Sequence, residues 1–549
     1  MHPALRLTAC GALVTLAALG TACTRVGTAG NGEALHPWTK PDTVRIGFYE
    51  EPDTLNPVTT EMSFSTDVFQ LVFDGLIRFD DRGRPIPDLA REVPTLANGG
   101  ISKDGRTLTY HLMPDAKWHD GVPVTARDVI FTWRQIMNPA NNVPTRVGYD
   151  RIVRIDAPDP HTVQLRFRQP YPPALFLFKN AAQGAILPEH LLRGATSLNR
   201  VPFNNAPVGS GPYVLDRWQH GNEMRFHANH AYFRGAPKIE HVVVRFVPDQ
   251  NTMLSQLRTH EIDLYFDLPP VQAEPIRSMP GIVLQSVSTL KWEHLNFNTK
   301  RPPLDQRDVR LALCYAVDED GIYKKIYHGF GRKAPTHFNP DFGWGDPALR
   351  HYPRDLVRAG ALLDAAGWRR GPGGQRQRSG VPLAFTISTV TGVKSREAIE
   401  VYLQSDWRAL GADVTVKNFP AATLFAPAGA GGMLQSGKTD VALFTWANTT
   451  PDPDDETYIS PKSLPPNGQN DTFFQSAAIA RYQDAGLATF DLPTRRRAYA
   501  AIAHVLYENV PEYVLDWLPE ITAANVDLHG VRPVPAGSDL WNIAQWTFR

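Results

Sequence analysis

The sequence predicts an α/β protein built as two lobes, and three observations support this prediction. The chain has 549 residues, which is too long for one ordinary hydrophobic core and suggests two or three folding units. Hydrophobic residues make up 42% of the chain, enough to fill such cores. Strand-like and helix-like segments alternate in both halves of the chain, which is the pattern expected of α/β lobes.

The first residues have the layout of an export signal. A weakly basic start with Arg6 precedes the apolar run 11–19, which is too short to span a bilayer. Small residues at 20–22 stand before Cys23, which resembles a bacterial lipoprotein signal, although Gly20 occupies a place where a leucine is usual. The alternative is an ordinary cleavable signal followed by a chance cysteine.

We therefore expect residues 1–22 to be a signal peptide. Residues 23–43 would hold the lipidated Cys23 and a small, polar tether to the membrane surface. Cys10 lies within the signal, so Cys314 is the remaining thiol of the mature chain. Its apolar neighbours have helical spacing, and we expect Cys314 to be a small buried core residue and not a disulfide partner.

The first half of the mature chain begins with a strand and a Pro- and Asp-rich loop within 43–57. A helix is predicted to start at Thr125, with Thr125 as its N-cap and Asp128 at the third helical position. The other strands are expected within 107–113, 161–178, 213–218, 238–249 and 261–266, and the other helices within 65–80 and 252–259.

The second half continues the alternation. Helices are predicted within 306–327, 353–368, 395–411 and 493–510, and strands within 383–389, 412–419, 440–446 and 513–519. The Arg- and Gly-rich stretch 369–380 is predicted to be a loop. We expect the chain to pass between lobes near 205–215, 290–300 and 515–520, where Trp and Pro residues gather.

The stretch GGMLQSGKTDVALFTW, residues 431–446, matches the P-loop pattern at Gly432, Gly437, Lys438 and Thr439. A P-loop needs a buried strand before it and a helix starting at the lysine. Here two prolines disfavour a central strand before the match, and a β-branched and aromatic run follows it. The stretch is therefore interpreted as a loop leading into a strand, with no nucleotide site.

Composition and motifs also limit the other functions. Lys plus Arg equals Asp plus Glu at 56 each, which argues against nucleic acid as a partner. His227 and His230 form an H-x-x-H pair without a third ligand at sensible spacing, so we expect no metal and no cofactor.

Motifs of common hydrolases are absent from the sequence. An exported enzyme with a dyad from distant residues remains an alternative, as does a sensor or chaperone-like lipoprotein.

The stretch DGRTLTYHLMPDAKWHDGVPVTARDVIFTW is the most specific of six blocks that, in order, resemble the extracytoplasmic solute-binding proteins of peptide-type ABC importers, a family with dipeptide-, oligopeptide- and nickel-binding members. The blocks lie at 104–133, 207–213, 227–249, 296–322, 361–368 and 495–518. The resemblance covers nearly all of the mature chain.

The resemblance implies a two-lobed periplasmic-binding-protein fold, the Venus flytrap, with an extra subdomain in the first lobe. A small solute would be held between the lobes and delivered to an ABC permease in the cytoplasmic membrane. The protein would be a monomer without catalytic residues, exported and lipid-anchored at the outer face of that membrane or in the periplasm. We expect lobe I to comprise 44–60, 205–290 and 520–549, the extra subdomain 61–204, and lobe II 291–519.

The resemblance also explains the stretch that matches the P-loop pattern. In the family, a loop glycine, two spacers and an aspartate lead into a strand that ends in tryptophan, followed by W-x-x-D-Y-P-D-P. Here these are Gly437, Asp440, Trp446 and the segment 451–453.

One position departs from the family pattern. In peptide-binding members, the acidic residue three places after this tryptophan takes the α-ammonium of the ligand, and here that residue is Thr449. Leaving a desolvated ammonium without its partner costs about 3–5 kcal/mol. The solute therefore either lacks a free α-ammonium, as an oligosaccharide does, or pairs with another carboxylate.

Several carboxylates could replace the missing one. The nearest are Asp452, Asp454, Asp455 and Glu456, and Glu61 on an early loop is a further candidate. A structural alternative makes Asp452 the N-cap of a helix that has proline at its first position and Asp455 at its third.

Other candidate ligand-binding residues surround the altered position. Trp292, Trp344 and Trp446 could line a cleft, since large rings offer contact area at low entropic cost, although core packing is the equally plausible alternative. Asn448 and Thr450 flank Thr449 and suit neutral hydrogen bonds to amides or sugar hydroxyls.

Overall fold

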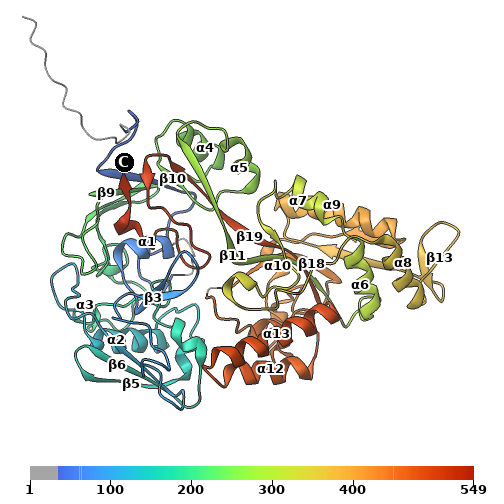
Figure 1. Cartoon of the computed structure of the whole chain (residues 1–549), viewed down its shortest axis with the longest axis horizontal. Coiled ribbons are helices and arrows are strands. Elements are labelled where there is room, and N and C mark those ends of the chain that lie inside the picture. The colour runs from blue at the N-terminus through green and yellow to red at the C-terminus, as the bar shows by residue number, and fades with distance from the viewer. Residues whose placement is uncertain (1–34, 61, 63–64, 449) are drawn as a thin grey trace, which may run out of the picture.

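The computed structural model describes residues 35–60, 62, 65–448 and 450–549 and has a mixed α/β architecture. Figure 1 shows two lobes side by side, with the first half of the chain mainly in one and the second half mainly in the other. Two long strands, β11 (Ile282–Phe297) and β19 (Glu512–Asn525), run from one lobe into the other. The predicted α/β class is confirmed.

An 11-stranded sheet passes through both lobes. Its order is β17-β16-β18-β11-β19-β10-β1-β9-β8-β7, and β12 (Arg332–Lys333) pairs with β19 beside this path. The remaining strands of this sheet are β1 (Thr43–Phe48), β7 (Tyr213–Gln219), β8 (Glu223–Ala228), β9 (His241–Phe246), β10 (Leu264–Tyr265), β16 (Ala384–Ser388), β17 (Asp413–Val416) and β18 (Val441–Ala447).

In the first lobe, β1 is an inner strand of the sheet. It pairs in parallel with β9 over its whole length and with β10 at Ile46 and Gly47. Its apolar side chains Val44, Ile46 and Phe48 are fully buried, as expected for a strand with both neighbours in place. Helices α4 (Gln250–Arg258) and α5 (Pro270–Ile276) pack over this end of the sheet with the cluster around Met253.

In the second lobe, β16 pairs in parallel with β17 and β18. The apolar side chains of four helices, α6 to α9, pack with these strands in a separate buried cluster that includes Cys314, the small core residue that the sequence predicts. The helices of this lobe are α6 (Arg307–Ala316), α7 (Glu319–Lys325), α8 (Leu356–Ala365), α9 (Lys394–Ala409), α10 (Ala421–Leu424), α11 (Glu456–Ile459), α12 (Ala477–Leu487) and α13 (Leu492–Asn509).

The long strands connect the two lobes. Antiparallel pairing of β11 with β19 runs from Ile282 opposite Asn525 to Asn296 opposite Glu512. The register shifts between Ser288 and Trp292, so the ladder is irregular near the point where the chain leaves the first lobe.

A smaller antiparallel sheet, β4-β6-β5, lies at the lower left of Figure 1 with helix α2 (Ala126–Met137) beside it. The predicted cap of α2 is confirmed, because the Asp128 carboxylate accepts a 2.8 Å hydrogen bond from the backbone N–H of Thr125. The remaining elements of the first lobe are β2 (Ile77–Phe79), β3 (Pro85–Pro87), β4 (Thr107–His111), β5 (Ile152–Asp159), β6 (Thr162–Phe167), β20 (Leu528–His529), β21 (Thr547–Phe548), α1 (Ser65–Val72) and α3 (Glu189–Leu192).

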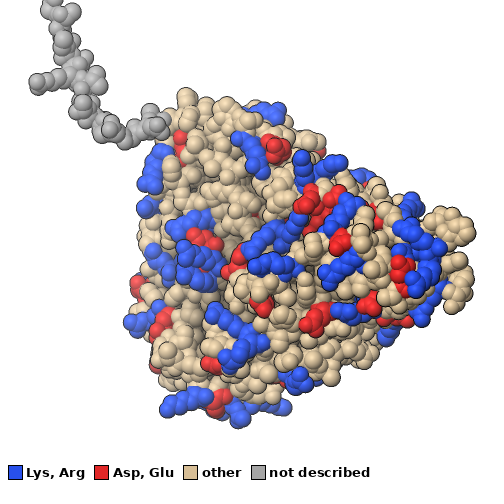
Figure 2. Space-filling model, turned by 45° about the vertical axis from the view of Figure 1, so that its right-hand side comes forward, with Lys and Arg blue, Asp and Glu red and all other residues tan. Residues whose placement is uncertain are grey.

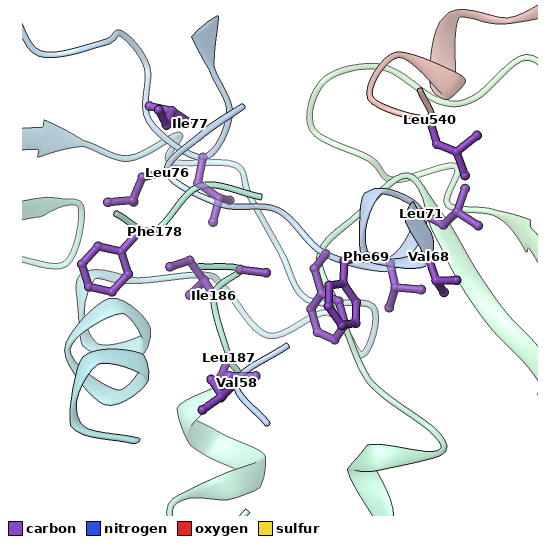
Figure 3. Packing of buried hydrophobic residues seen from close by; sticks show 14 of the residues in the cluster. Val58, Val68, Phe69, Leu71, Leu76, Ile77, Phe178, Ile186, Leu187 and Leu540 are labelled. Atoms are coloured by element: carbon purple, nitrogen blue, oxygen red, sulfur yellow. The ribbon is translucent and has the colours of Figure 1, made fainter. Parts of the chain in front are cut away.

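The largest core joins these elements with the C-terminal segment. Figure 3 shows Val68 and Leu71 of α1 in the same cluster as Leu540, which comes from near the end of the chain.

The PVGSGPY block packs against the end of α1. A Cβ built on Gly209 would lie 1.7 Å from the carbonyl oxygen of Val72, so no side chain fits there.

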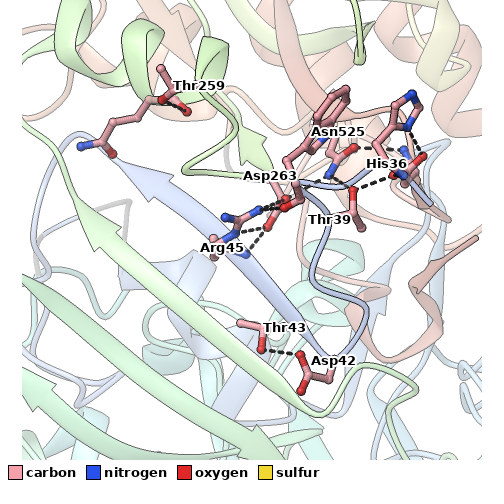
Figure 4. Close-up of polar contacts among 11 residues, drawn as sticks. His36, Thr39, Asp42, Thr43, Arg45, Thr259, Asp263 and Asn525 are labelled. Atoms are coloured by element: carbon pink, nitrogen blue, oxygen red, sulfur yellow. Dashed lines mark hydrogen bonds and ion pairs between the residues drawn. The ribbon is translucent and has the colours of Figure 1, made fainter.

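A polar network fixes the start of the described chain to the sheet. The Arg45 guanidinium donates to both carboxylate oxygens of the buried Asp263 at 2.8 and 2.7 Å, and the Asn525 amide donates to the same carboxylate (Figure 4). Asn525 also donates to Thr39, so β1, β19 and Asp263, which directly precedes β10, share one set of bonds.

Three sequence predictions of secondary structure were wrong. The helix expected within 65–80 ends at Val72, and strand β2 occupies 77–79. The helix expected over 306–327 is two helices, α6 and α7, because the Asp318 side chain accepts from the backbone N–H of Gly321 and caps a new helix. The loop expected over 369–380 holds strands β13 (Arg369–Arg370) and β14 (Arg376–Arg378), which pair with each other and then with β15 (Val381–Pro382). Buried Arg376 orders that segment by donating to the backbone oxygens of Leu410 and Trp368.

The surface carries mixed charge. Figure 2 shows basic and acidic side chains interspersed on the face it presents, in keeping with the equal totals of the sequence. Among the described residues, no helix is long and apolar enough to cross a membrane.

Candidate functional site

A cavity of about 310 Å³ lies between the segment 145–184 and the loop 450–457, which follows β18 and leads into α11. We call it the central cavity. Its first wall contains the two short 3-10 turns Tyr149–Arg151 and Pro172–Phe176. It is lined by Thr145, Val147, Tyr149, Arg151, Tyr171, Pro173, Phe176, Leu177, Lys179, Ala182, Gln183, Gly184, Thr450, Asp452, Asp454, Glu456 and Thr457.

The cavity adjoins a second hollow on the first wall. An adjoining hollow of about 630 Å³ shares Arg151 and Tyr171 with it. Aromatic and aliphatic side chains line the first wall, and the second wall is polar and acidic. This combination of apolar area with a few charged groups is typical of sites that bind small solutes.

The basic residues stand on the first wall. Arg151 reaches across to Glu456, with 3.4 Å between Nη2 and Oε2, and its guanidinium lies 4.6 Å from the ring centroid of Tyr171. Burial lowers the pKa of Lys179 to about 8. Arg151 already forms an ion pair with Glu456. A bound solute would therefore either compete with one of these two residues for its partner or bind to the pair as a third member.

Asp452 lines the cavity but is committed to an internal partner. Arg495 of α13 donates to both of its carboxylate oxygens, each at 2.8 Å, and both side chains are buried. The alternative interpretation of Asp452 as a helix N-cap was wrong, because α11 begins at Glu456 with Asp455 at the N-cap position.

Asp455 is held in a second buried network. It accepts from the Asn448 amide at 2.7 Å and lies 3.1 Å from Nε2 of His337, whose Nδ1 contacts Glu512. Burial alone would lower the pKa of His337, but Glu512 and Asp455 outweigh it and raise the pKa to about 10. His337 is therefore a buried cation between two carboxylates, and Asn448 faces this network.

Asp454 differs from its neighbours. Its carboxylate accepts from the backbone N–H of Glu456 at 3.3 Å, and no Lys, Arg or His among the described residues forms an ion pair with it. Burial and the nearby Asp452 carboxylate raise the pKa of Asp454 to about 7. Of the acidic residues on the second wall, Asp454 is thus the one left to receive a cation from outside the chain.

The three tryptophans singled out in the sequence lie around the loop, and none lines the central cavity in this structure. Trp292 is 1% exposed and stacks on His337. Trp344 donates from Nε1 to the backbone oxygen of Pro451 at 2.6 Å, which holds the loop in place. Trp446 lines a different pocket beside Phe444. Thr450 and Asp452 do line the central cavity, whereas Glu61, Thr449 and Cys23 lie outside the described residues.

The motifs that the sequence analysis set aside have ordinary structural roles. Lys438 precedes strand β18 and no helix follows it, so the interpretation of 431–446 as a loop and a strand is confirmed. His227 pairs with Asp216, and His230 pairs with Glu240. Within the part of the chain that the structure describes, no group of three or more His, Cys, Asp and Glu could hold a metal ion.

Sequence reasoning missed the first wall of the cavity. Arg151 and Lys179 carry no local signal, because only the tertiary fold brings them opposite the loop 450–457. Tyr171 did carry one: it stands between prolines in the segment QPYPP that ends strand β6, where an aromatic ring is held in a rigid turn.

Comparison with known proteins gives concordant matches. The family model described as "Bacterial extracellular solute-binding proteins, family 5 Middle" matches residues 84–465. The chain is 30% identical to Protein XP55 of Streptomyces lividans over 498 residues, covering 90% of this chain and 86% of that protein. It is 24% identical to the oligopeptide-binding protein AppA of Bacillus subtilis, covering 91% and 90% of the two chains.

A solved structure agrees in fold over the same extent. NikZ from Campylobacter jejuni, in complex with Ni(L-His), superimposes with a TM-score of 0.74 at 28% identity, covering 93% of this chain and all of that one.

Proposed function

Because the chain belongs to family 5 of the bacterial extracellular solute-binding proteins, we propose that it captures an oligopeptide or a related small solute in the central cavity and delivers it to the permease of an ABC importer. Family membership makes the chain an extracellular or periplasmic substrate-binding protein of the ABC-transporter type and not an enzyme. What we propose beyond family membership is the class of solute and delivery to an importer.

The unpaired Asp454 carboxylate is the observation that supports a solute with a free amine. At the position of Thr449 the chain lacks the acid that takes the α-ammonium in peptide-binding members. Asp454 lies five residues further along, on the cavity wall, without a cation partner among the described residues. An α-ammonium placed there would gain a charge-assisted bond and lower the pKa of Asp454 from about 7.

The proposed capture step uses both walls. The lobes would comprise 44–60 with 205–290 and 520–549, and 291–519, with 61–204 as a subdomain of the first. A solute that contacts both Tyr171 and Asp454 stabilises whichever arrangement brings the walls together, since only differential contacts shift such an equilibrium. The β11–β19 pair is the natural hinge, because its ladder is irregular near Ser288.

The proposed location at the membrane rests on the sequence. A lipid on Cys23 would keep the binding protein close to its permease, but the tether predicted over 23–43 would be shorter than expected, because His36 and Thr39 bond to Asp527 and strand β1 begins at Thr43.

A thermal-shift screen of residues 24–549 against peptides, N-acetylated peptides and oligosaccharides tests the proposal. Saturating solute raises the free energy of unfolding by RT ln(1 + [L]/Kd), about 2.7 kcal/mol at a hundredfold excess. We expect peptides to raise Tm, N-acetylated peptides to fail, and Asp454→Asn to lose most of the peptide response. The matched control is Asp484→Asn, an exposed aspartate on α12.

Two results would contradict the proposal. A response to amine-free compounds alone would show that the loss of the acid at position 449 has changed the class of solute. An undiminished peptide response in Asp454→Asn would show that another carboxylate binds the amine.

A further inference from the structure

A second pocket, of about 260 Å³, lies beside strand β18 and shares no lining residue with the central cavity. We call it the aromatic pocket. Its volume far exceeds the roughly 10–15 Å³ that one water needs. It is lined by Phe425, Leu434, Gln435, Phe444, Thr445, Trp446, Gln469 and Asp471.

Asp471 is the charged residue of this pocket, and its side chain has no ion-pair or hydrogen-bond partner in the described part of the chain. The side chain is 8% exposed, and Oδ1 is buried without a hydrogen-bond donor among the described residues. Of the residues that the structure describes, no Lys, Arg or His lines the pocket, and burial raises the pKa of Asp471 to about 7. An unpaired buried carboxylate costs free energy in the empty protein, so its presence beside a cavity calls for a ligand.

The rest of the lining favours an organic cation. Phe444 and Trp446 lie on the same face of β18, two residues apart, and Phe425 packs edge-on against Phe444 with ring centroids 5.5 Å apart. Aromatic faces attract ammonium and guanidinium groups, and the apolar rings also accommodate the aliphatic stem of such a group. One carboxylate among aromatic rings is a poor set of ligands for a divalent metal ion, which prefers several oxygen ligands.

We propose that the aromatic pocket binds the cationic end of an arginine- or lysine-type side chain, with Asp471 as its counter-ion and Trp446 and Phe444 as its aromatic walls. The same segment of chain that supplies Trp446 continues into the loop 450–457 of the central cavity. For the peptides of the proposed function, on which this part depends, the pocket would select those with a basic side chain.

Calorimetric titration with n-propylguanidinium, compared with its neutral analogue n-propylurea, tests the pocket without any peptide. We expect saturable binding of the guanidinium and none of the urea. Asp471→Asn should weaken binding at least tenfold, because it removes the counter-ion. Phe425→Ala, a change at an exposed ring, should weaken it about two- to fivefold.

The control is Asp413→Asn, an exposed carboxylate at the start of β17, which should bind like the wild type. Circular dichroism and Tm establish that each variant is folded. Equal binding of the urea, unchanged binding in folded Asp471→Asn, or no saturable binding of n-propylguanidinium would each overturn the proposal. None of these results bears on the central cavity, which is tested separately with peptides.

Discussion

Asp452, which the sequence predicts as a ligand contact, also stabilises the fold. Its carboxylate is bonded twice by Arg495, which is 43 residues away in the chain. The acidic run 452–456 is visible in the sequence, but which of its members already have cation partners depends on α13 and on His337. Local signals are more reliable, as the cap formed by Thr125 and Asp128 shows, because both partners lie within one turn.

Removing the Asp452 carboxylate should therefore destabilise the protein. Asp452→Ala leaves Arg495 as a buried, unpaired cation, and we expect the free energy of unfolding to fall by about 3–5 kcal/mol. Urea denaturation measures this loss. Asp484→Ala, which breaks the exposed pair with Lys462, should cost less than about 1 kcal/mol, and equal losses in the two variants would contradict the account.

His337 should give the unfolding free energy a particular dependence on pH. Its pKa is about 10 in the folded protein and about 6.5 when unfolded, so its stabilising charge is fully present below pH 6.5 and is lost as pH rises toward 10. The difference in unfolding free energy between wild type and His337→Gln should shrink over this range, by an amount on the order of a few kcal/mol. His504→Gln, at an exposed histidine, is the control, and a constant difference would contradict the prediction.

At the scale of elements, the periodic segments were predictable and the interruptions were not. Helices α8, α9 and α13 and strands β16 to β18 lie where apolar spacing places them. The break between α6 and α7 depends on one cap at Asp318, and the hairpin at 369–378 depends on a buried arginine, so neither appears in the periodicity.

The PVGSGPY block illustrates how a glycine positions an element. Gly209→Ala would place a methyl group against the Val72 carbonyl at the end of α1, and backbone atoms there cannot turn aside. We expect a loss of about 1–3 kcal/mol of unfolding free energy, as for other overpacked sites. Gly194→Ala meets no atom within 4 Å and should change stability by less than about 0.5 kcal/mol. Equal effects in urea denaturation would refute the close-packing explanation.

At the scale of the whole molecule, the resemblance stated from six sequence blocks anticipated the family and the α/β fold. It did not anticipate the first wall of the central cavity, because Arg151, Tyr171 and Lys179 face the loop 450–457 across hundreds of residues of sequence. The central claim is that one solute contacts both walls at once.

Hydrogen–deuterium exchange of residues 24–549, with and without a peptide that raises Tm, tests this claim most directly. Amides that open locally exchange quickly, and a bound solute protects the segments that it holds. The account predicts that peptide slows exchange in both 145–184 and 450–457, and that Asp454→Asn loses the protection in both segments together. Protection confined to one of the two segments, or located away from both, would contradict capture between the lobes.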